Sequence, residues 1–389
     1  MRQRAPRTRS ETVRGALLLI AGLSCVVATA LAGASEIPRR ADGRPDLSGT
    51  YDLATLTPLA RPPQFGDKAS LTEAEAKAYA DHWNGNVAKD LEPSDPNRGA
   101  PAEGGVIFAI PEFDGAAGGV GGYNTFYLDL GDSTFQLDGR YPTSIIVDPP
   151  NGQMPPLTAA GRERFAEREE SRQENTGTAW WIDLEAGPYD DPELRPAAER
   201  CLLGFGSTAG PPTLPNYFYN NLKRIVQTDD HVMILAEMIH DARIIRLFEN
   251  TDENTDENTD ESAEHDPPEI RKWLGDSVGR WEGDTLVVET MHFRDTPSFS
   301  QGSRDMKVTE RFSRLDESTL LYEFTVDDSS TWTKPWSGRF PWPQVEDRVY
   351  EYACHEGNYS FGGILRGARQ LEREALEARA VEKESSGEP

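Results

Sequence analysis

Hydrophobic and polar residues alternate in short runs through the second half of the chain, and short polar loops separate these runs. Alternation with a period of two is typical of strands that bury one face. The runs occupy residues 225–226, 231–239, 279–281, 285–293, 307–313, 319–326, 332–339 and 348–354. We therefore expect about eight strands in this half of the chain.

Strands joined in sequence by short polar loops are typical of an antiparallel meander. About eight of them can close into a lipocalin-like or other small β-barrel, which either fills itself with side chains or holds one ligand. We assign this barrel to residues 216–366. The fold class is mainly β, and a charged helical or disordered tail is expected at residues 367–389.

The N-terminal half of the mature chain, residues 35–215, is rich in Gly and Pro and has few periodic segments. Two helices are predicted there, at 71–83 and 159–173, and the first has capping-box spacing between Thr72 and Glu75. Short strands are expected at 124–130 and 144–147. The Gly-rich residues 115–122 lack the Lys and Ser or Thr of a phosphate loop, so we interpret them as a flexible turn.

The first 34 residues have the pattern of an export signal. Arg2, Arg4, Arg7, Arg9 and Arg14 precede an apolar run at 16–32, and small residues follow it. A membrane anchor and a lipid attached to Cys25 are the alternatives. We expect cleavage after residue 34 and a periplasmic or secreted protein.

The charge argues against two kinds of partner, nucleic acid and the membrane. The sequence carries a net charge of −26, and removal of the five Arg and one Glu in residues 1–34 would make it −30. Such a field repels nucleic acid and anionic lipid surfaces, so we expect neither nucleic-acid binding nor stable membrane insertion after cleavage. A small-molecule or carbohydrate ligand remains, and the oligomeric state stays open. The acidic repeat at 249–260 lacks the Gly of a calcium loop and is interpreted as a solvated insertion.

Two cysteines, Cys201 and Cys354, remain after the expected cleavage. In an oxidising compartment two distant cysteines can close a disulfide across the fold. Two buried free thiols, or a reactive Cys354 beside His355, are the alternatives.

The first candidate site is Glu237, His240, Asp241 and Arg243, at the end of an apolar run. On an unbroken strand His240 shares a face with the apolar residues, and the other three face the opposite way. A bend near His240 would re-aim them, so that Glu237, His240 and Arg243 could serve as base, proton shuttle and anion clamp. The alternative is a structural ion bridge with no chemical role.

The second candidate group is His355 and Glu356, placed at the end of the last expected strand, with Glu310 as a further inward carboxylate. First and last strands are neighbours in a closed barrel, so both groups would form one site. This favours acid–base chemistry without metal or cofactor, as in a lyase, isomerase or hydrolase. A non-catalytic ligand-binding or cell-envelope protein is the alternative, and structural pairing of Glu310 with an Arg is the alternative for that residue.

Other chemistries receive less support. The Gly-Asp-Ser sequence at 275–277 precedes a hairpin rather than following an early α/β strand, which argues against a Gly-Asp-Ser hydrolase. The six His show no zinc-ligand spacing. Aromatic residues late in the chain could stack on a ligand or form the barrel core; they are Trp332, Trp336, Trp342, Tyr350 and Tyr352.

The block at 275–290, Gly-Asp-Ser-Val-Gly-Arg-Trp-Glu-Gly-Asp-Thr-Leu-Val-Val-Glu-Thr, resembles a large group of secreted bacterial proteins with no assigned activity. Further blocks that resemble this group lie at 42–51, 237–243, 308–312, 321–328 and 352–359. The resemblance implies an exported β-rich fold and carries no activity to this chain.

Overall fold

The computed structural model describes residues 37–90, 97, 129–170, 177–204, 209–216, 219–248, 265–295, 297, 299 and 301–386. The expected export signal, the Gly-rich turn at 115–122 and the acidic repeat at 249–260 lie outside these residues, as does most of the strand expected at 124–130.

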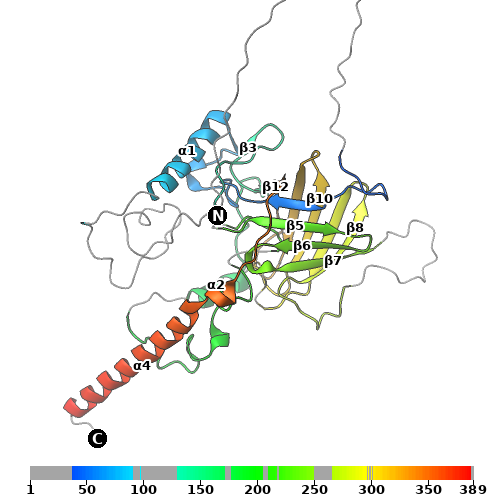
Figure 1. The fold of residues 1–389 in the computed structure, drawn as a ribbon. Coiled ribbons are helices and arrows are strands. Elements are labelled where there is room, and N and C mark those ends of the chain that lie inside the picture. Colours follow the sequence, from blue (N-terminus) through cyan, green and yellow to red (C-terminus); the bar gives the residue numbers. More distant parts are fainter. Residues whose placement is uncertain are drawn as a thin grey trace, which may run out of the picture. The chain divides into compact units, whose positions relative to one another are not determined.

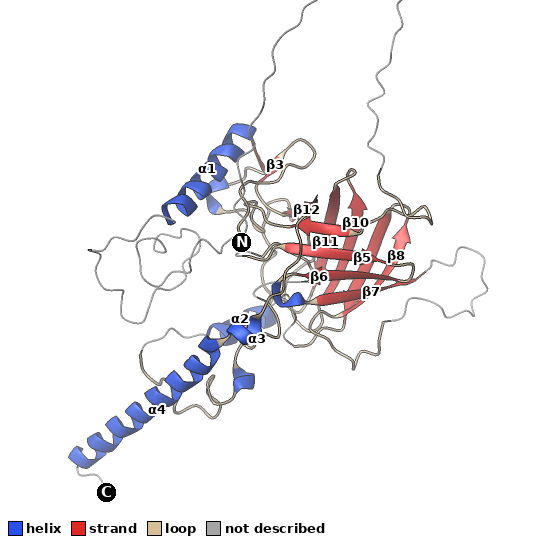
Figure 2. Cartoon of the chain, viewed as in Figure 1, coloured by secondary structure: helices blue, strands red, loops and turns tan. Residues whose placement is uncertain are grey.

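Nine strands form a closed β-barrel, which Figure 1 shows as a ribbon and Figure 2 shows with its strands in red. The predicted mainly β fold with a small barrel is confirmed. The barrel strands are β1 (Gly49–Asp52), β5 (Leu222–Gln227), β6 (His231–Ala236), β7 (Ala242–Phe248), β8 (Asp276–Glu282), β9 (Thr285–Met291), β10 (Lys307–Arg314), β11 (Thr319–Asp327) and β12 (Trp336–Val345).

The barrel closes through β1, which pairs with β5 on one side and with β12 on the other. A short further strand, β4 (Ile146–Asp148), pairs with the first part of the same edge of β12. All neighbours are antiparallel except β7 and β8, which are parallel. A closed ring with an odd number of strands cannot alternate throughout, so one parallel pair is required, and the long connection between β7 and β8 permits it.

The barrel interior is filled by side chains that alternate with outward ones along each strand. Aromatic rings from the last two strands are fully or almost fully buried and contact one another; they are Tyr322, Phe324, Trp336, Phe340 and Trp342. Trp332 is buried as well, whereas Tyr350 is exposed. Trp332, Trp336 and Trp342 are therefore core residues, as in the second of the two alternatives given for them.

The two predicted helices lie between β1 and β5: α1 (Glu73–Asp90) and α2 (Ala159–Glu170). The capping box is present, since Thr72 Oγ1 accepts from the backbone N–H of Glu75 and the Glu75 carboxylate accepts from Thr72. Strand β2 (Ser70–Leu71) directly precedes α1 and contacts it, and it pairs with β3 (Tyr141–Pro142) in a two-stranded sheet.

The C-terminal tail is the long helix α4 (Tyr359–Ser386). Its Ala368 packs in a small core with Ala179 and Trp181, and Glu372 accepts from the Trp181 indole N–H at 2.7 Å. Arg379 forms a bidentate ion pair with Asp183. The tail is thus helical and anchored to residues 179–189.

The strand expected at 348–354 is wrong. Those residues follow β12 without regular structure and lead into the one-turn helix α3 (Cys354–Gly357). The edge of β12 on which a further strand could pair is already occupied by β1 and β4. Residues 348–354 therefore have no backbone groups to pair with. We call residues 346–353 the strap.

The strap is tied down by a disulfide between Cys201 and Cys354, with a Cα–Cα distance of 5.8 Å and a sequence separation of 153 residues. The predicted bridge is confirmed, and the two alternatives of free thiols fall away. Asn358 Nδ2 also donates to the Glu199 carbonyl at 2.8 Å, next to the bridge.

Cross-linking so long a loop removes much conformational freedom from the unfolded chain. We expect the free energy of unfolding of the variant C201S/C354S to be about 2–5 kcal/mol lower than that of the wild type, as measured by urea denaturation. A reductant should lower the stability of the wild type and leave the variant unchanged. Equal stability of the two proteins would contradict a structural role for the bridge.

Candidate functional site

The chain turns sharply between β6 and β7 in the 3-10 turn η4 (Met238–His240). Ile239 and His240 have φ values of 62° and 46°, in the left-handed region that β-branched residues such as Ile rarely adopt. The bend foreseen near His240 is therefore present. Because of it, inward positions change from even to odd numbers between the strands, and Arg243 points into the barrel.

Arg243 and Glu310 form an ion pair inside the barrel, with exposures of 2% and 0%. Arg243 Nη2 donates to Glu310 Oε1 at 2.8 Å, and Nη1 donates to Oε2. Tyr322 donates its hydroxyl proton to Glu310 at 2.8 Å and accepts from the Thr213 backbone N–H at 2.8 Å. Burial and the Glu310 charge raise the pKa of Tyr322 well above its ordinary value. Glu310 thus pairs with an Arg, which was the structural alternative.

Glu237 is buried at the start of the turn η4, and its side chain binds the strap. Its carboxylate accepts from the Tyr350 backbone N–H at 3.0 Å, while its own N–H donates to the Leu222 carbonyl at 3.0 Å. Glu237 therefore links three segments: β5, the turn and the strap.

His240, His355 and Glu356 are exposed. His240 lies on η4, and the other two lie on α3 rather than at the end of a barrel strand. The expectation that His240 and His355 flank one site on neighbouring strands is wrong, because residues 348–353 form no strand and His240 lies in the turn η4.

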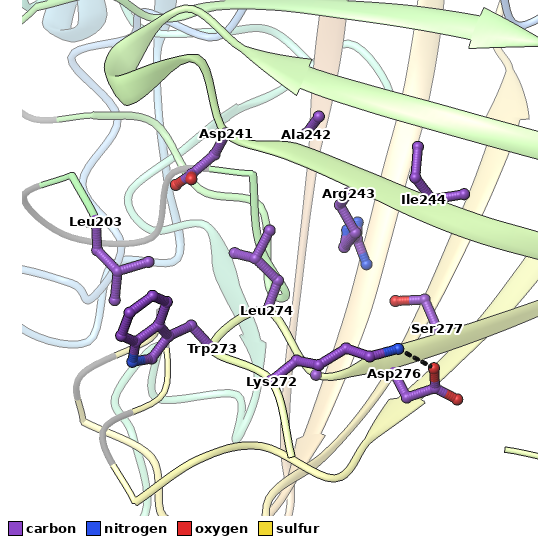
Figure 3. Close-up of a pocket in the computed structure, with 11 residues that line it drawn as sticks. Leu203, Asp241, Ala242, Arg243, Ile244, Lys272, Trp273, Leu274, Asp276 and Ser277 are labelled. Carbon is purple, nitrogen blue, oxygen red and sulfur yellow. Dashed lines mark hydrogen bonds and ion pairs between the residues drawn. The ribbon is translucent and has the colours of Figure 1, made fainter. Parts of the chain in front are cut away.

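A pocket of about 350 Å³ opens between the start of β7 and the segment that leads into β8 (Figure 3). Asp241 and Arg243 line it, so two of the seven predicted residues meet there. The other wall is formed by Leu203, Lys272, Trp273, Leu274 and Ser277. Of these, the sequence analysis had considered only Ser277, in the Gly-Asp-Ser sequence. In Figure 3, Trp273 and Leu203 lie together on one side and Ser277 on the other.

Polar groups along this pocket are held in place by their own partners. Ser277 Oγ shares a hydrogen bond of 2.9 Å with Thr290 Oγ1, so its partner is not a general base. Lys272 Nζ donates to Asp276 at 2.9 Å and to Asp266 at 2.7 Å. These contacts give a rigid rim and favour binding over nucleophilic chemistry at Ser277.

Asp276 anchors the segment that forms the rim. Burial alone would raise its pKa, but hydrogen bonds from Lys272, the Asp266 backbone and His265 hold that pKa well below its ordinary value. His265 Nδ1 lies 3.0 Å from Asp276, and Arg246 Nη2 donates to the same carboxylate at 2.6 Å. Asp276 thereby ties the start of β8 to its parallel neighbour β7.

Lys223 is a further buried charge that sequence reasoning missed. It points inward from β5, has no exposed surface, and its Nζ has no hydrogen-bond partner in the described part of the chain. Burial lowers its pKa to about 8, against the opposing effect of the Glu237, Asp241 and Asp52 carboxylates. The sequence pattern could have indicated it: Lys223, Ile225 and Gln227 alternate with exposed residues along β5, so Lys223 occupies the inward position before Ile225.

Within the described ranges, no group of three or more His, Cys, Asp or Glu side chains is arranged to hold a metal ion. Likewise, none of the helices in those ranges is long and apolar enough to cross a bilayer. No protein-family model, no curated protein and no solved structure matches the chain. The site is therefore interpreted from its own geometry.

Removing one member of the buried ion pair leaves the other charge unpaired. We expect Arg243→Met and Glu310→Leu each to lower the free energy of unfolding by about 3–5 kcal/mol. The double variant should lose less than the sum, because it buries no charge and leaves only the Tyr322 hydroxyl without its acceptor. Chemical denaturation of the four proteins gives the coupling energy.

The exposed pair Arg311–Glu282 provides the matched control, with side-chain exposures of 42% and 37%. Arg311→Met should cost less than about 1 kcal/mol, because solvent screens a surface ion pair. Additive losses at Arg243 and Glu310 would show that the buried pair is not coupled.

The lowered pKa of Lys223 makes stability depend on pH. Between pH 8 and 10.5 the unfolded lysine holds a proton that the folded one has released, so wild-type stability rises with pH across this window. The cost of burying the charge is fully present below pH 8. We expect Lys223→Met to be more stable than the wild type by about 3 kcal/mol at pH 7, with the difference shrinking by pH 9.5. Urea denaturation at both pH values measures it, and a constant difference would contradict the lowered pKa.

Proposed function

We propose that the protein is an exported β-barrel that binds a small organic molecule in the pocket between β7 and residues 272–277. The observation that carries the proposal is this pocket of about 350 Å³, where an apolar wall meets charged groups. Ligand pockets in proteins have this size and this mixture of surfaces. The protein as a whole serves as a rigid holder, because the barrel interior is packed with side chains.

The lining indicates what kind of ligand fits. Trp273 and Leu203 offer a flat apolar surface, and the guanidinium of Arg294 lies 4.9 Å from the centre of the Trp273 ring. Asp241 and Lys272 add one negative and one positive side chain at the same pocket. A small ligand with an apolar or aromatic body and hydrogen-bonding groups at its ends complements this surface, as does a sugar ring that packs on Trp273.

Binding is favoured over acid–base catalysis because the pocket contains neither candidate histidine. The charge of Arg243 is neutralised by Glu310, and Glu237 is occupied by the strap. A general acid or base must reach the proton it transfers, and these groups are held by structural partners. Asp241 is the remaining predicted residue on the pocket wall.

The export part of the proposal rests on different evidence. The N-terminal sequence has the composition of an export signal, and the disulfide between Cys201 and Cys354 is of a kind that persists in oxidising compartments. The resemblance of the block at 275–290 to secreted bacterial proteins supports the same location, the periplasm or the medium.

The test is a ligand screen with the mature protein, residues 35–389, in which stabilisation against heat reports binding. Compounds that stabilise the wild type should bind Trp273→Ala about 10–100-fold more weakly, because a large aromatic contact is lost. Isothermal titration measures the affinities. Mass spectrometry of the incubated compounds should show them unchanged; formation of product would favour the acid–base alternative.

Ile270→Ala is the matched control, since Ile270 is a half-exposed apolar residue just before the pocket segment and does not line the pocket. Its affinities should equal those of the wild type. Ligands that bind Trp273→Ala as well as they bind the wild type would place the binding site elsewhere.

A further inference from the structure

Arg243 has a buried N–H group that no protein group accepts. Its Nη1 and Nη2 bind Glu310, whereas its Nε has no hydrogen-bond partner among the described residues, and the side chain is only 2% exposed. Of the buried side-chain N and O atoms in this state, Nε of Arg243 is the one whose residue lines the pocket between β7 and residues 272–277. A buried donor without a partner destabilises the fold, so its presence at a pocket indicates an acceptor that a ligand brings.

Ser277 offers a second donor on the same side of the pocket. Its hydroxyl and that of Thr290 share one hydrogen bond of 2.9 Å, although the two hydroxyls carry two protons. When Thr290 donates, the proton of Ser277 remains for another acceptor, and Ser277 lines the pocket while Thr290 does not. Figure 3 shows the Ser277 hydroxyl pointing to the side on which Arg243 lies. One ligand oxygen between the two residues would satisfy both donors.

The charges around the pocket favour a neutral oxygen over a carboxylate. The positive charge of Arg243 is already balanced by Glu310, and Lys272 donates to two aspartates. Asp241 adds a negative charge to the lining, which repels an anionic ligand. An ammonium group, in contrast, has only donors and finds no acceptor at Arg243 Nε. A carbonyl oxygen accepts hydrogen bonds and adds no charge.

Trp273 determines the body of the ligand. The guanidinium of Arg294 lies over one face of its ring, 4.9 Å from the ring centre, so a ligand has the other face for stacking. A cation over one face weakens the attraction of the ring for a second cation, which again favours a neutral ligand. Leu203 lies beside Trp273 in the pocket wall and extends the apolar surface. A flat aromatic ring fits this wall.

We propose that the pocket takes neutral aromatic carbonyl compounds, such as aryl amides and aryl ketones, an inference that rests on the ligand-binding function proposed above. The ring of the ligand stacks on Trp273. Its carbonyl oxygen has two lone pairs and accepts from Arg243 Nε and from Ser277 Oγ. No covalent bond forms or breaks, so the compound leaves the pocket unchanged.

Three probes with the same ring test the ligand class: benzamide, benzoate and benzylamine. By isothermal titration, the mature protein should bind benzamide about tenfold more tightly than either of the other two. Ser277→Ala should weaken benzamide binding about 3–10-fold and leave benzylamine binding unchanged, because only the amide oxygen uses that hydroxyl. Ser337→Ala is the matched control, since Ser337 Oγ shares a hydrogen bond of 2.8 Å with Thr325 Oγ1 and does not line the pocket. Its affinities should equal those of the wild type.

The Nε–H group of Arg243 gives a direct readout by NMR. In the ¹⁵N-labelled mature protein, saturation with benzamide should move the Arg243 Nε–H proton resonance downfield, because a new hydrogen bond deshields the proton. Arg61 is the internal control: it is buried as well, does not line the pocket, and its Nε already donates to Thr143 Oγ1 at 2.9 Å. The Arg61 resonance should stay in place.

Benzylamine or benzoate binding as tightly as benzamide would overturn the ligand class, as would an Arg243 Nε–H resonance that does not move at saturation. Failure of all three compounds to bind would overturn the ligand class too, while the broader screen still tests the pocket. Failure of the proposed function has a different sign, because Trp273→Ala would then bind benzamide as tightly as the wild type does.

Discussion

The ion pair of Arg243 and Glu310 is the constraint on which the barrel depends. Two buried charges persist in an aromatic core only when they are paired, and here Tyr322 also donates to Glu310 and accepts from the Thr213 backbone N–H. The pair spans the barrel from β7 to β10 and so fixes which faces of these strands point inward. A shift of either strand by one residue would turn its charge outward and leave the other buried alone.

The pocket follows from the same constraint. The turn η4 reverses the chain with two left-handed residues, and this brings Arg243 inward while Asp241 stays at the pocket wall. Asp276, held by Lys272, His265 and Arg246, fixes the facing segment at the start of β8. The pocket therefore lies at the single parallel pairing of the barrel, where the chain must cross over and cannot cover the sheet with a tight hairpin.

The fold was accessible from the sequence because period-two alternation reports burial directly. Strands β5, β6 and β8 to β11 overlap the predicted runs, whereas β7 falls on none of them, and the Cys201–Cys354 bridge was one of the options. The closing strand β1 was missed as a barrel strand, since four residues give too short a pattern. The strap was wrongly predicted as a strand, because alternation in the sequence does not report whether a free sheet edge is present for pairing. The site was harder to predict than the fold. Pairing of Glu310 with an Arg was one of the alternatives, but the residues around Lys223 and Trp273 come from segments that are distant in sequence.

The closure of the barrel through β1 has a consequence for how the chain reaches its native state. Thr50 of β1 pairs with Val345 of β12. The second edge of β1, the first barrel strand to be synthesised, can therefore form its hydrogen bonds only after β12, the last one, has been synthesised. Contacts between such distant residues close slowly. During vectorial delivery, N-terminus first, β1 would remain an open edge prone to wrong pairing until nearly the whole chain has emerged. Its brevity limits that danger, because four residues make a poor template for another chain.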